Sequence, residues 1–473
     1  MSIPLSMPPL ALLLAVMGTA PERALPFPAD APLALREEPS SQGAAPASQP
    51  AEPPPAPRLW TSLGEVTAIN VGIWLTDRYL LNKEWAHVTL ESLGQTLRAG
   101  FVWDTDNFGT NQFAHPYHGS LYYNAARDNG FGYVGSSLFT FLGSVQWELL
   151  SETEPAAIND LANTSLGGIA LGEILYRLSS EVLDDSTTGL DRVGHELAAA
   201  VLSPSRGFNR LVHGESWRVG SEPRQEPPFH RLLLVGQFGY LKLANGTAVL
   251  QGTDQLFAQI VMRYGDPVYA EINKPFDAYS VEAQFTTKEH RLVSHSQIRG
   301  VLASTPLLST ESSRLVLGAL QHFDYTNVQA YEVGGQSFSG SLLYARQLSQ
   351  VDSLRAALHL KGVVLGGISS EHSVSVGRNY DYGPGLDLQL EARYLYRGWE
   401  IATAEAGMAW LHTLNGSKGQ HLTLAGKVQV DFPIYRSLGV GMAGTLFQRN
   451  SFYRNFPNTI QNTSQLRVFL SLH

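Results

Sequence analysis

The chain has 473 residues, with 42 acidic and 33 basic side chains, a net charge of −9 and only 16% charged residues. Because an average soluble domain carries roughly 25% charged residues, this composition does not favour an ordinary soluble enzyme. The absence of cysteine excludes disulfides, thiolate metal sites and cysteine nucleophiles, and the negative charge argues against nucleic acid as a partner.

The N-terminus has the composition of an export signal. An apolar run over residues 10–17 is followed by small residues at 18–20, where a signal peptidase cuts. No positive charge precedes the run, and Pro21 would impede cleavage. We nevertheless predict a signal peptide over residues 1–20. Residues 21–59 are rich in proline and alanine, which predicts a disordered linker.

The segment from Trp60 to about Ser203 is poor in charge and has apolar residues at helical spacing. Pro155 precedes one expected helix, where a proline suits the first turn, and Pro204 closes the last. We therefore predict a helical domain over residues 60–211. Its expected helices are 63–81, 121–150, 156–183 and 190–202.

From about Phe229 onward the apolar period changes to two, as in β-strands. The clearest alternation lies in 386–396, where leucines and tyrosines on one face oppose Asp387, Gln389 and Glu391 on the other. The same alternation recurs to the end of the chain, notably in 354–361, 422–432 and 465–473.

Two folds fit such strands. A transmembrane barrel would turn the apolar face to lipid, whereas a soluble sandwich would hide it against a second sheet. The long strands in series, the aromatic residues near strand ends such as Trp399 and Trp410, and the export signal favour the barrel. We predict a mixed fold: an N-terminal all-α helical region, then a C-terminal antiparallel transmembrane β-barrel over 229–473, with about twelve strands.

Five polar side chains in the helical region form a candidate catalytic cluster. Glu148 and Glu152 are four residues apart and share a helix face, and Asp160 and Asn163 share a face of the next helix. If the two helices pack as a hairpin, His118 joins them in a poorly solvated pocket, where carboxylates have raised pKa values and serve as general acid or base. The alternative is a buried polar network that fixes the register of the hairpin.

Two motifs resemble metal sites. Asp104 and Asp106 open a loop like that of a calcium site, but residues that do not bind calcium occupy later ligand positions. A turn in which the Asp side chains accept hydrogen bonds from neighbouring backbone amides fits better. His115 and His118 are three apart, but the proline between them disfavours a regular helix. We predict no metal and no cofactor.

Small and basic residues follow the cluster. Gly168 and Gly172 at helical spacing let two helices approach closely, which is a packing feature. Arg206 and Arg210 lie in an expected turn into the barrel. They can bind phosphate or carboxylate, and we favour carboxylate.

The helical segment resembles the bacterial domain-of-unknown-function family 3943, over roughly residues 60–211. The resemblance implies a Gram-negative envelope protein and assigns no catalytic residue, because the role of that family is undetermined. The matching residues are 100–104, Asp106, Phe108, 111–113, 115–119, 143–144, 147–148, Glu152, 159–160, 167–168, 172–173 and 206–210.

A looser similarity links residues 115–173 to the VanZ-like membrane family. The matching positions are His118, Glu148, Asp160, Asn163 and Gly167. VanZ-like proteins usually space the Asp and Asn four apart, whereas here they are three apart, and the usual Arg between the Glu and the Asp has no match. The similarity implies a shared helical-hairpin site and leaves its chemistry open.

The leading hypothesis is a non-enzymatic outer-membrane barrel, exported to the Gram-negative envelope, whose helices form a plug inside the barrel or a cap or docking surface at its periplasmic mouth. Its expected partners are outer-membrane lipids and a small-molecule or lipid ligand. The alternative is a membrane-embedded enzyme that modifies lipid or glycolipid. In that enzyme Glu148 or Glu152 acts as base and His118 as acid or orienting group, while Asp160 and Asn163 position the substrate.

Overall fold

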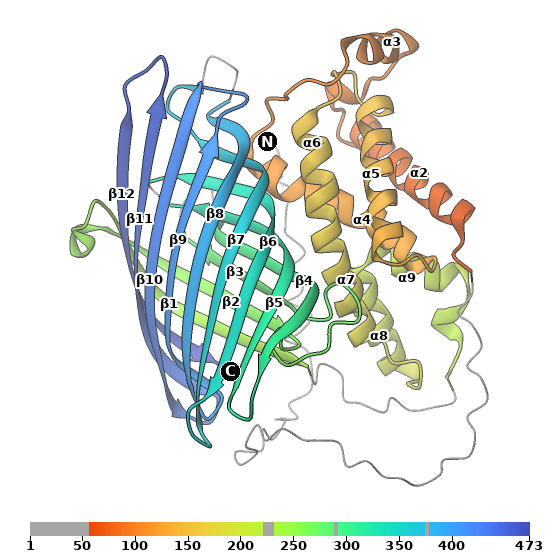
Figure 1. Ribbon diagram of the computed structural model, residues 1–473. Coiled ribbons are helices and arrows are strands. Elements are labelled where there is room, and N and C mark those ends of the chain that lie inside the picture. Colours follow the sequence, from red (N-terminus) through yellow and green to blue (C-terminus); the bar gives the residue numbers. More distant parts are fainter. Residues whose placement is uncertain (1–55, 221–230, 288–291, 329, 374–377) are drawn as a thin grey trace.

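The computed structural model describes residues 56–220, 231–287, 292–328, 330–373 and 378–473. A helical region and a closed antiparallel barrel lie side by side in it (Figure 1). The predicted fold class is therefore confirmed. The predicted signal peptide, and the linker apart from its last few residues, lie outside the described part of the chain.

The barrel has twelve strands, the predicted number, and closes because β1 pairs with β12. Each strand is antiparallel to its neighbours. The strands are β1 (Leu232–Asn245), β2 (Thr253–Tyr264), β3 (Tyr279–Thr286), β4 (Val293–Ser309), β5 (Ser313–Asn327), β6 (Glu332–Gln347), β7 (Asp352–Ser369), β8 (Tyr380–Tyr396), β9 (Trp399–His412), β10 (Gly419–Tyr435), β11 (Leu438–Tyr453) and β12 (Thr459–Leu472).

The two ends of the barrel differ in their connections. At the terminal end, where β1 begins and β12 ends, most turns are short, such as Arg397-Gly398 between β8 and β9. Both residues of that turn have positive φ, which suits a two-residue hairpin. The exception is the β2–β3 loop, 265–278. The opposite end, called the loop end here, has the longer connections 370–379 and 413–418.

Charged side chains fill the lumen. The Lys361 ammonium is fully buried between Asp324 of β5, at 2.7 Å, and Asp387 of β8, at 3.1 Å. Since side chains alternate along a strand, Phe323 and Tyr325 on β5 point to the outer wall. The predicted polar face of 386–396 thus faces the lumen.

The outer wall of the barrel exposes the predicted apolar faces. Large aliphatic side chains point outward from strands on several sides of the barrel, as a lipid-facing surface requires. Exposed examples are Leu317, Leu360, Leu386, Leu390, Met442, Leu446 and Leu470.

The helical region differs from the prediction in three places: it has an additional helix over 90–99, a helix instead of a turn over 204–212, and a break within 121–150. The expected helix 121–150 is two helices, because the chain turns at Asn129 and at Gly130, whose φ is 91°. The helical segments are α2 (Leu59–Leu75), η1 (Thr76–Leu80), η2 (Glu84–Ala86), α3 (Leu90–Ala99), η3 (Thr110–Ala114), α4 (His115–Asp128), α5 (Tyr133–Leu150), α6 (Ile158–Ala162), η4 (Asn163–Gly167), α7 (Gly168–Val182), α8 (Gly189–Leu202), α9 (Pro204–Val212), η5 (Glu215–Trp217) and, within the barrel, η6 (Val249–Gln251).

Helices α4 and α7 cross at closely spaced glycines, as their small residues predict. A Cβ atom on Gly168 would come within 2.5 Å of the backbone of Gly119, and one on Gly172 within 2.7 Å of the Tyr123 side chain. The backbones therefore meet directly at this crossing, and no larger side chain fits there.

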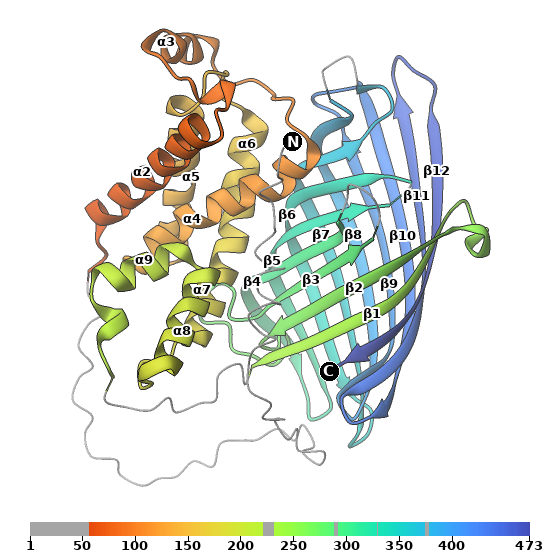
Figure 2. The same cartoon turned by 180° about the vertical axis from the view of Figure 1, so that it is seen from behind.

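The helices contact the outer wall of the barrel, and both views show them beside it (Figures 1 and 2). The Phe113 ring packs 4.8 Å from Tyr325 and 6.1 Å from Phe323, centroid to centroid. The Tyr133 hydroxyl donates to Oε1 of Gln321 at 2.7 Å. Of the expected positions, a plug inside the lumen does not fit this arrangement, and a cap or docking surface at the periplasmic mouth stays a prediction. Within the described ranges, no helix is both long and apolar enough to cross a membrane.

The β2–β3 loop, residues 265–278, connects the two parts. Its Val268 packs inside the barrel against Val316 and Leu343. At its other end, Phe276 is fully buried and stacks on Tyr133 of α5, with ring centroids 5.9 Å apart. This loop therefore occupies the terminal end of the lumen while it also contacts the helices.

Candidate functional site

The predicted cluster residues lie where α4, α5 and α6 meet. His118 is on α4, Glu148 is in the last turn of α5, Glu152 follows that helix, Asp160 is on α6 and Asn163 begins η4. Nearby contacts to residues 378–382 place the cluster beside the loop end of the barrel. It lies on the outer side of the wall.

Two π-helical turns shape the site. η3 precedes His115, and η4 includes Asn163. A π turn adds a residue to the helical repeat, and such turns are frequent at functional sites. Both turns change the direction in which the following side chains point, so regular helical spacing does not describe this site.

An ion pair joins the start of α4 to α6. Nε2 of His115 lies 3.2 Å from Oδ1 of Asp160 and 3.8 Å from Oδ2 of Asp106. Burial opposes the imidazolium, but these carboxylates outweigh it and raise the pKa of His115 well above its usual value. The same contact lowers the pKa of Asp160 despite its burial. At neutral pH the pair is charged.

Glu148 is a neutral acid at pH 7. Burial, with a smaller contribution from the neighbouring carboxylates of Glu152 and Asp160, raises its pKa to about 9. Its Oε2 accepts a hydrogen bond of 2.8 Å from the backbone N–H of Ala157, which only partly opposes the shift. Glu148 is therefore placed to donate a proton.

Glu152 titrates close to neutrality. Burial raises its pKa to about 7, while the hydrogen bond of 2.7 Å from the Trp147 indole and the positive charge of His115 oppose the shift. A carboxylate with a pKa near the working pH suits a general base. Of the two glutamates proposed as base, the pKa values favour Glu152.

His118 is partly buried and uncharged. Its ring contacts Trp147 edge-on with centroids 4.7 Å apart, and its Nε2 lies 2.7 Å from the Tyr122 hydroxyl. Burial, with the nearby positive charge of His115, lowers the pKa of His118 to about 3. The predicted role as an acid does not fit that pKa, whereas the orienting role does.

A chain of amides links the cluster to the barrel. Asn163 and Asn159 both donate to Oδ1 of Asn111, at 3.2 and 3.1 Å. Asn111 in turn donates to the Tyr380 hydroxyl of β8 at 3.2 Å. Asn163 is thus part of a polar network that extends to the barrel wall.

Asp104 belongs to the site although it was not among the predicted site residues. Burial, together with the charge of Asp160, raises its pKa to about 8. Its Oδ1 accepts a hydrogen bond of 2.6 Å from the backbone N–H of Asp106, which confirms the turn interpretation of the calcium-like loop. Among the residues with described positions, no group of three or more His, Asp or Glu side chains could hold a metal.

Sequence reasoning missed Asp104, Asn111 and Asn159 and underrated His115. The motif of the 3943 family includes all four positions, so that resemblance was the available signal. Helical periodicity could not find them, because η3 stands between Asp104 and His115.

The two arginines of the expected turn bind carboxylates, as predicted. Nε of Arg206 lies 2.9 Å from Oδ1 of Asp128, and Nη2 of Arg210 lies 2.9 Å from Oε1 of Glu196. Both belong to the packing of helix α9, which replaces the expected turn.

Comparison with known families matches residues 100–205 to the family described as a domain of unknown function (DUF3943). This confirms the resemblance for a segment that contains the whole candidate site. The VanZ-like similarity stays a prediction. No curated protein matches the chain.

Solved structures that align with about half of this chain include three barrels. The NanC porin has 10% identity, covers 51% of this chain and 100% of its own, and has a TM-score of 0.28. Outer membrane phospholipase A from Escherichia coli has 10% identity, coverage of 50% and 92%, and a TM-score of 0.26. The KdgM porin has 9% identity, coverage of 50% and 98%, and a TM-score of 0.23.

Proposed function

We propose that this chain is an outer-membrane barrel protein of the Gram-negative envelope, exported by its N-terminal signal, whose helical region contacts lipid beside the barrel and serves a structural, transport or docking role. The observation that carries the proposal is an apolar outer surface present on both parts. On the barrel, it is the outward leucine surface that surrounds a charged lumen.

The helices extend that surface. Val134, Leu138 and Phe141 are exposed on one face of α5, with Leu138 61% exposed. Helix α8 likewise exposes Leu190 and Leu197. Exposed apolar patches of this kind mark membrane or protein contacts, and here they flank a barrel whose own outer wall is apolar.

Cysteine accessibility tests this placement directly, because the chain has no cysteine of its own. In intact outer membranes, Leu138→Cys should resist a water-soluble maleimide and react after detergent extraction. The matched site Glu154→Cys, on an exposed loop near the cluster, should react in both conditions. Equal labelling of both sites in membranes would contradict lipid contact by α5.

The barrel itself is tested on a denaturing gel. The unboiled protein should migrate apart from the boiled protein and should fractionate with outer membranes. Identical migration together with a soluble protein would overturn the proposal.

The convergence of acid and base groups favours a second candidate function, a lipid- or glycolipid-modifying enzyme. Glu152 would act as base, Glu148 as acid and His118 as an orienting group, with Asp160 and Asn163 positioning the substrate. Their place beside the outer wall would put the reaction in contact with membrane lipid.

Lipid mass spectrometry distinguishes this candidate from a structural cluster. Glu152→Gln and Glu148→Gln should each accumulate an unmodified lipid, whereas Glu154→Gln, a matched exposed carboxylate, should not. If the two cluster variants keep the heat-modifiable band and their lipid profile equals that of wild type, the enzyme candidate is wrong.

A further inference from the structure

We propose that the barrel lumen contains, at its terminal end, a binding site for a small organic oxyanion: a carboxylate or phosphate ester that carries an apolar group. This inference is independent of the acid and base cluster, which lies outside the wall and beside the loop end.

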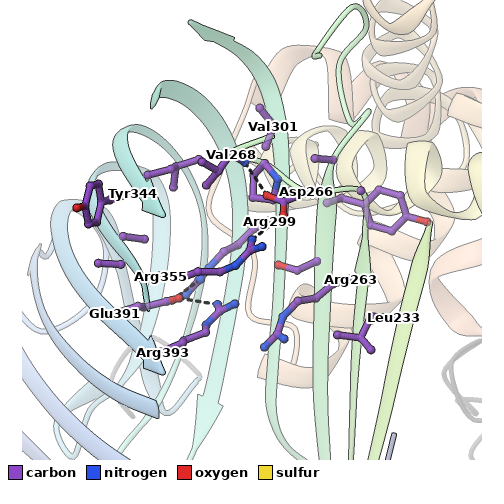
Figure 3. A pocket seen from close by; sticks show the side chains of 18 of the residues that line it. Leu233, Arg263, Asp266, Val268, Arg299, Val301, Tyr344, Arg355, Glu391 and Arg393 are labelled. Atoms are coloured by element: carbon purple, nitrogen blue, oxygen red, sulfur yellow. Dashed lines mark hydrogen bonds and ion pairs between the residues drawn. The ribbon is translucent and has the colours of Figure 1, made fainter. Parts of the chain in front are cut away.

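The site is a cavity of about 320 Å³ bounded by the β2–β3 loop and by strands on several sides of the lumen. Figure 3 shows Arg263, Arg299, Arg355 and Arg393 converging on it from β2, β4, β7 and β8. A cavity of this size is in the range of small-molecule sites. Four guanidinium groups around one space suit an anion, because each can present a planar pair of N–H groups to an oxyanion.

Carboxylates hold these arginines in position without using all their donors. Arg263 contacts Glu400 at 3.1 Å, and Arg393 contacts Glu391 at 2.8 Å. Arg299 also pairs with Glu391. Because one carboxylate serves two arginines and each guanidinium has five N–H donors, donors remain for a ligand. The groups are pre-organised, so little conformational entropy would be lost on binding.

Two buried polar atoms in the lining point to a missing partner. Nε2 of His359 and Nε of Arg299 have no hydrogen-bond partner among the described residues. The His359 residue is only 2% exposed, and its Nδ1 is already bonded to Ser341 at 2.7 Å. An unpaired buried donor or acceptor is costly, and a bound oxyanion or its hydroxyl group would satisfy both atoms.

Much of the remaining lining is apolar, and it indicates that the ligand also carries an apolar group. Leu233, Val301, Leu320 and Leu343 line the cavity, with Val268 from the loop. The loop also contributes Asp266, which lies 2.7 Å from Arg355 and fixes the loop over the cavity. An inorganic ion alone would leave this apolar surface without a contact, so we infer an organic anion.

Calorimetric titration of the full chain in detergent tests the site with benzoate and phenyl phosphate as probes and benzamide as the uncharged analogue. At least one anion should bind roughly tenfold more tightly than benzamide, because hydrogen bonds to charged groups are the stronger ones. Arg299→Gln and His359→Phe should each weaken that binding by roughly tenfold. Lys427→Gln is the matched control, since it removes a lumen cation that pairs with Glu405 outside this cavity.

Three results would overturn the proposal: no binding of either anion, equal binding of benzamide, or unchanged binding by Arg299→Gln. If Arg299→Gln gives no heat-modifiable band, Arg355→Gln at the edge of the cavity replaces it, with the same expected loss. Equal weakening by Lys427→Gln would also contradict a local site, because it would show only a general effect of lumen charge.

Discussion

Nε2 of His115 lies 3.2 Å from Oδ1 of Asp160, and this largely buried ion pair joins the start of α4 to α6. The raised pKa of His115 means that its stabilising contribution is complete below about 6.5 and is lost as pH rises through its folded-state pKa. The lowered pKa of Asp160 means that its contribution is lost as pH falls below about 3.8. Both contributions are therefore complete between about pH 3.8 and about pH 6.5, and the pair stabilises the helical region most in that range.

Replacing Asp160 alone should lower the unfolding free energy more than replacing both His115 and Asp160. We expect Asp160→Asn to lower the unfolding free energy of the helical region by about 3 kcal/mol, because it leaves a largely buried imidazolium with only the more distant and more exposed Asp106 as its partner. The double variant His115→Asn with Asp160→Asn should recover part of that loss. Hydrogen exchange of peptides from α4 and α6 measures both, and equal protection in Asp160→Asn and wild type would contradict the prediction.

Glu148 should make the helical region less stable as pH rises. Its pKa is about 9 in the folded protein against 4.5 for an ordinary glutamate, so between those values the folded state holds a proton that the unfolded state has lost. Stability therefore falls with pH over that range, by up to about 1.4 kcal/mol per pH unit for this group.

Glu148→Gln should flatten this dependence, because glutamine does not titrate. Urea unfolding at pH 5, 7 and 9 measures the slope, and Glu154→Gln serves as the control. A slope in Glu148→Gln as steep as in wild type would show that Glu148 does not carry the effect.

The glycine crossing of α4 and α7 should not accept a side chain. A valine at position 168 would meet the backbone of Gly119, so we expect Gly168→Val to destabilise the helical region by about 2 kcal/mol or more. Gly64→Ala on α2 is the control, because its Cβ would have no neighbour within 4 Å and alanine favours helix. Thermal unfolding followed by limited proteolysis compares the stability of the two variants. An unfolding temperature of Gly168→Val equal to that of wild type would contradict the close approach of α4 and α7.

Substitution of Lys361 should lower the thermal stability of the barrel. Lys361→Met would leave Asp324 and Asp387 beside each other without their cation, and breaking such a pair costs about 3 kcal/mol or more. The temperature at which the folded gel band disappears should fall clearly. Lys242→Met, which breaks a pair with the exposed Asp254, should shift that temperature little.

The barrel was predictable because side chains along a strand alternate between lumen and outer wall, so the sequence shows apolar residues at every second position. Strand residues 386–396 alternate in sequence, and the structure places Asp387 in the lumen and Leu386 on the outer wall. The number of strands followed from the length of the alternating segment. The packing of the helices did not follow, because outward residues such as Phe323 and Tyr325 have the same apolar character whether they meet lipid or a helix.

The candidate site was predictable in part. Glu148, Glu152 and Asp160 do converge, and the pattern of an apolar helical hairpin was enough to find them. Asp104 and Asn111 were not found, because Asp104 precedes the π turn η3 and Asn111 lies within it, and that turn breaks the helical repeat before α4. The split of 121–150 at Gly130 had a local signal in the Asn-Gly pair, and it was outweighed by the long apolar pattern.

The β2–β3 loop connects the interior of the barrel to the helices. Arg177 of α7 contacts Asp277 at 3.0 Å and the Pro275 carbonyl oxygen at 2.7 Å, while Val268, in the same loop, fills the lumen. Phe276 between them has φ of 66°, a strained conformation that persists because Tyr133 and Gly300 enclose its ring. Displacement of α7 would break the contacts of Arg177 with Asp277 and Pro275, so the place of Val268 in the lumen depends on how the helices pack on the barrel.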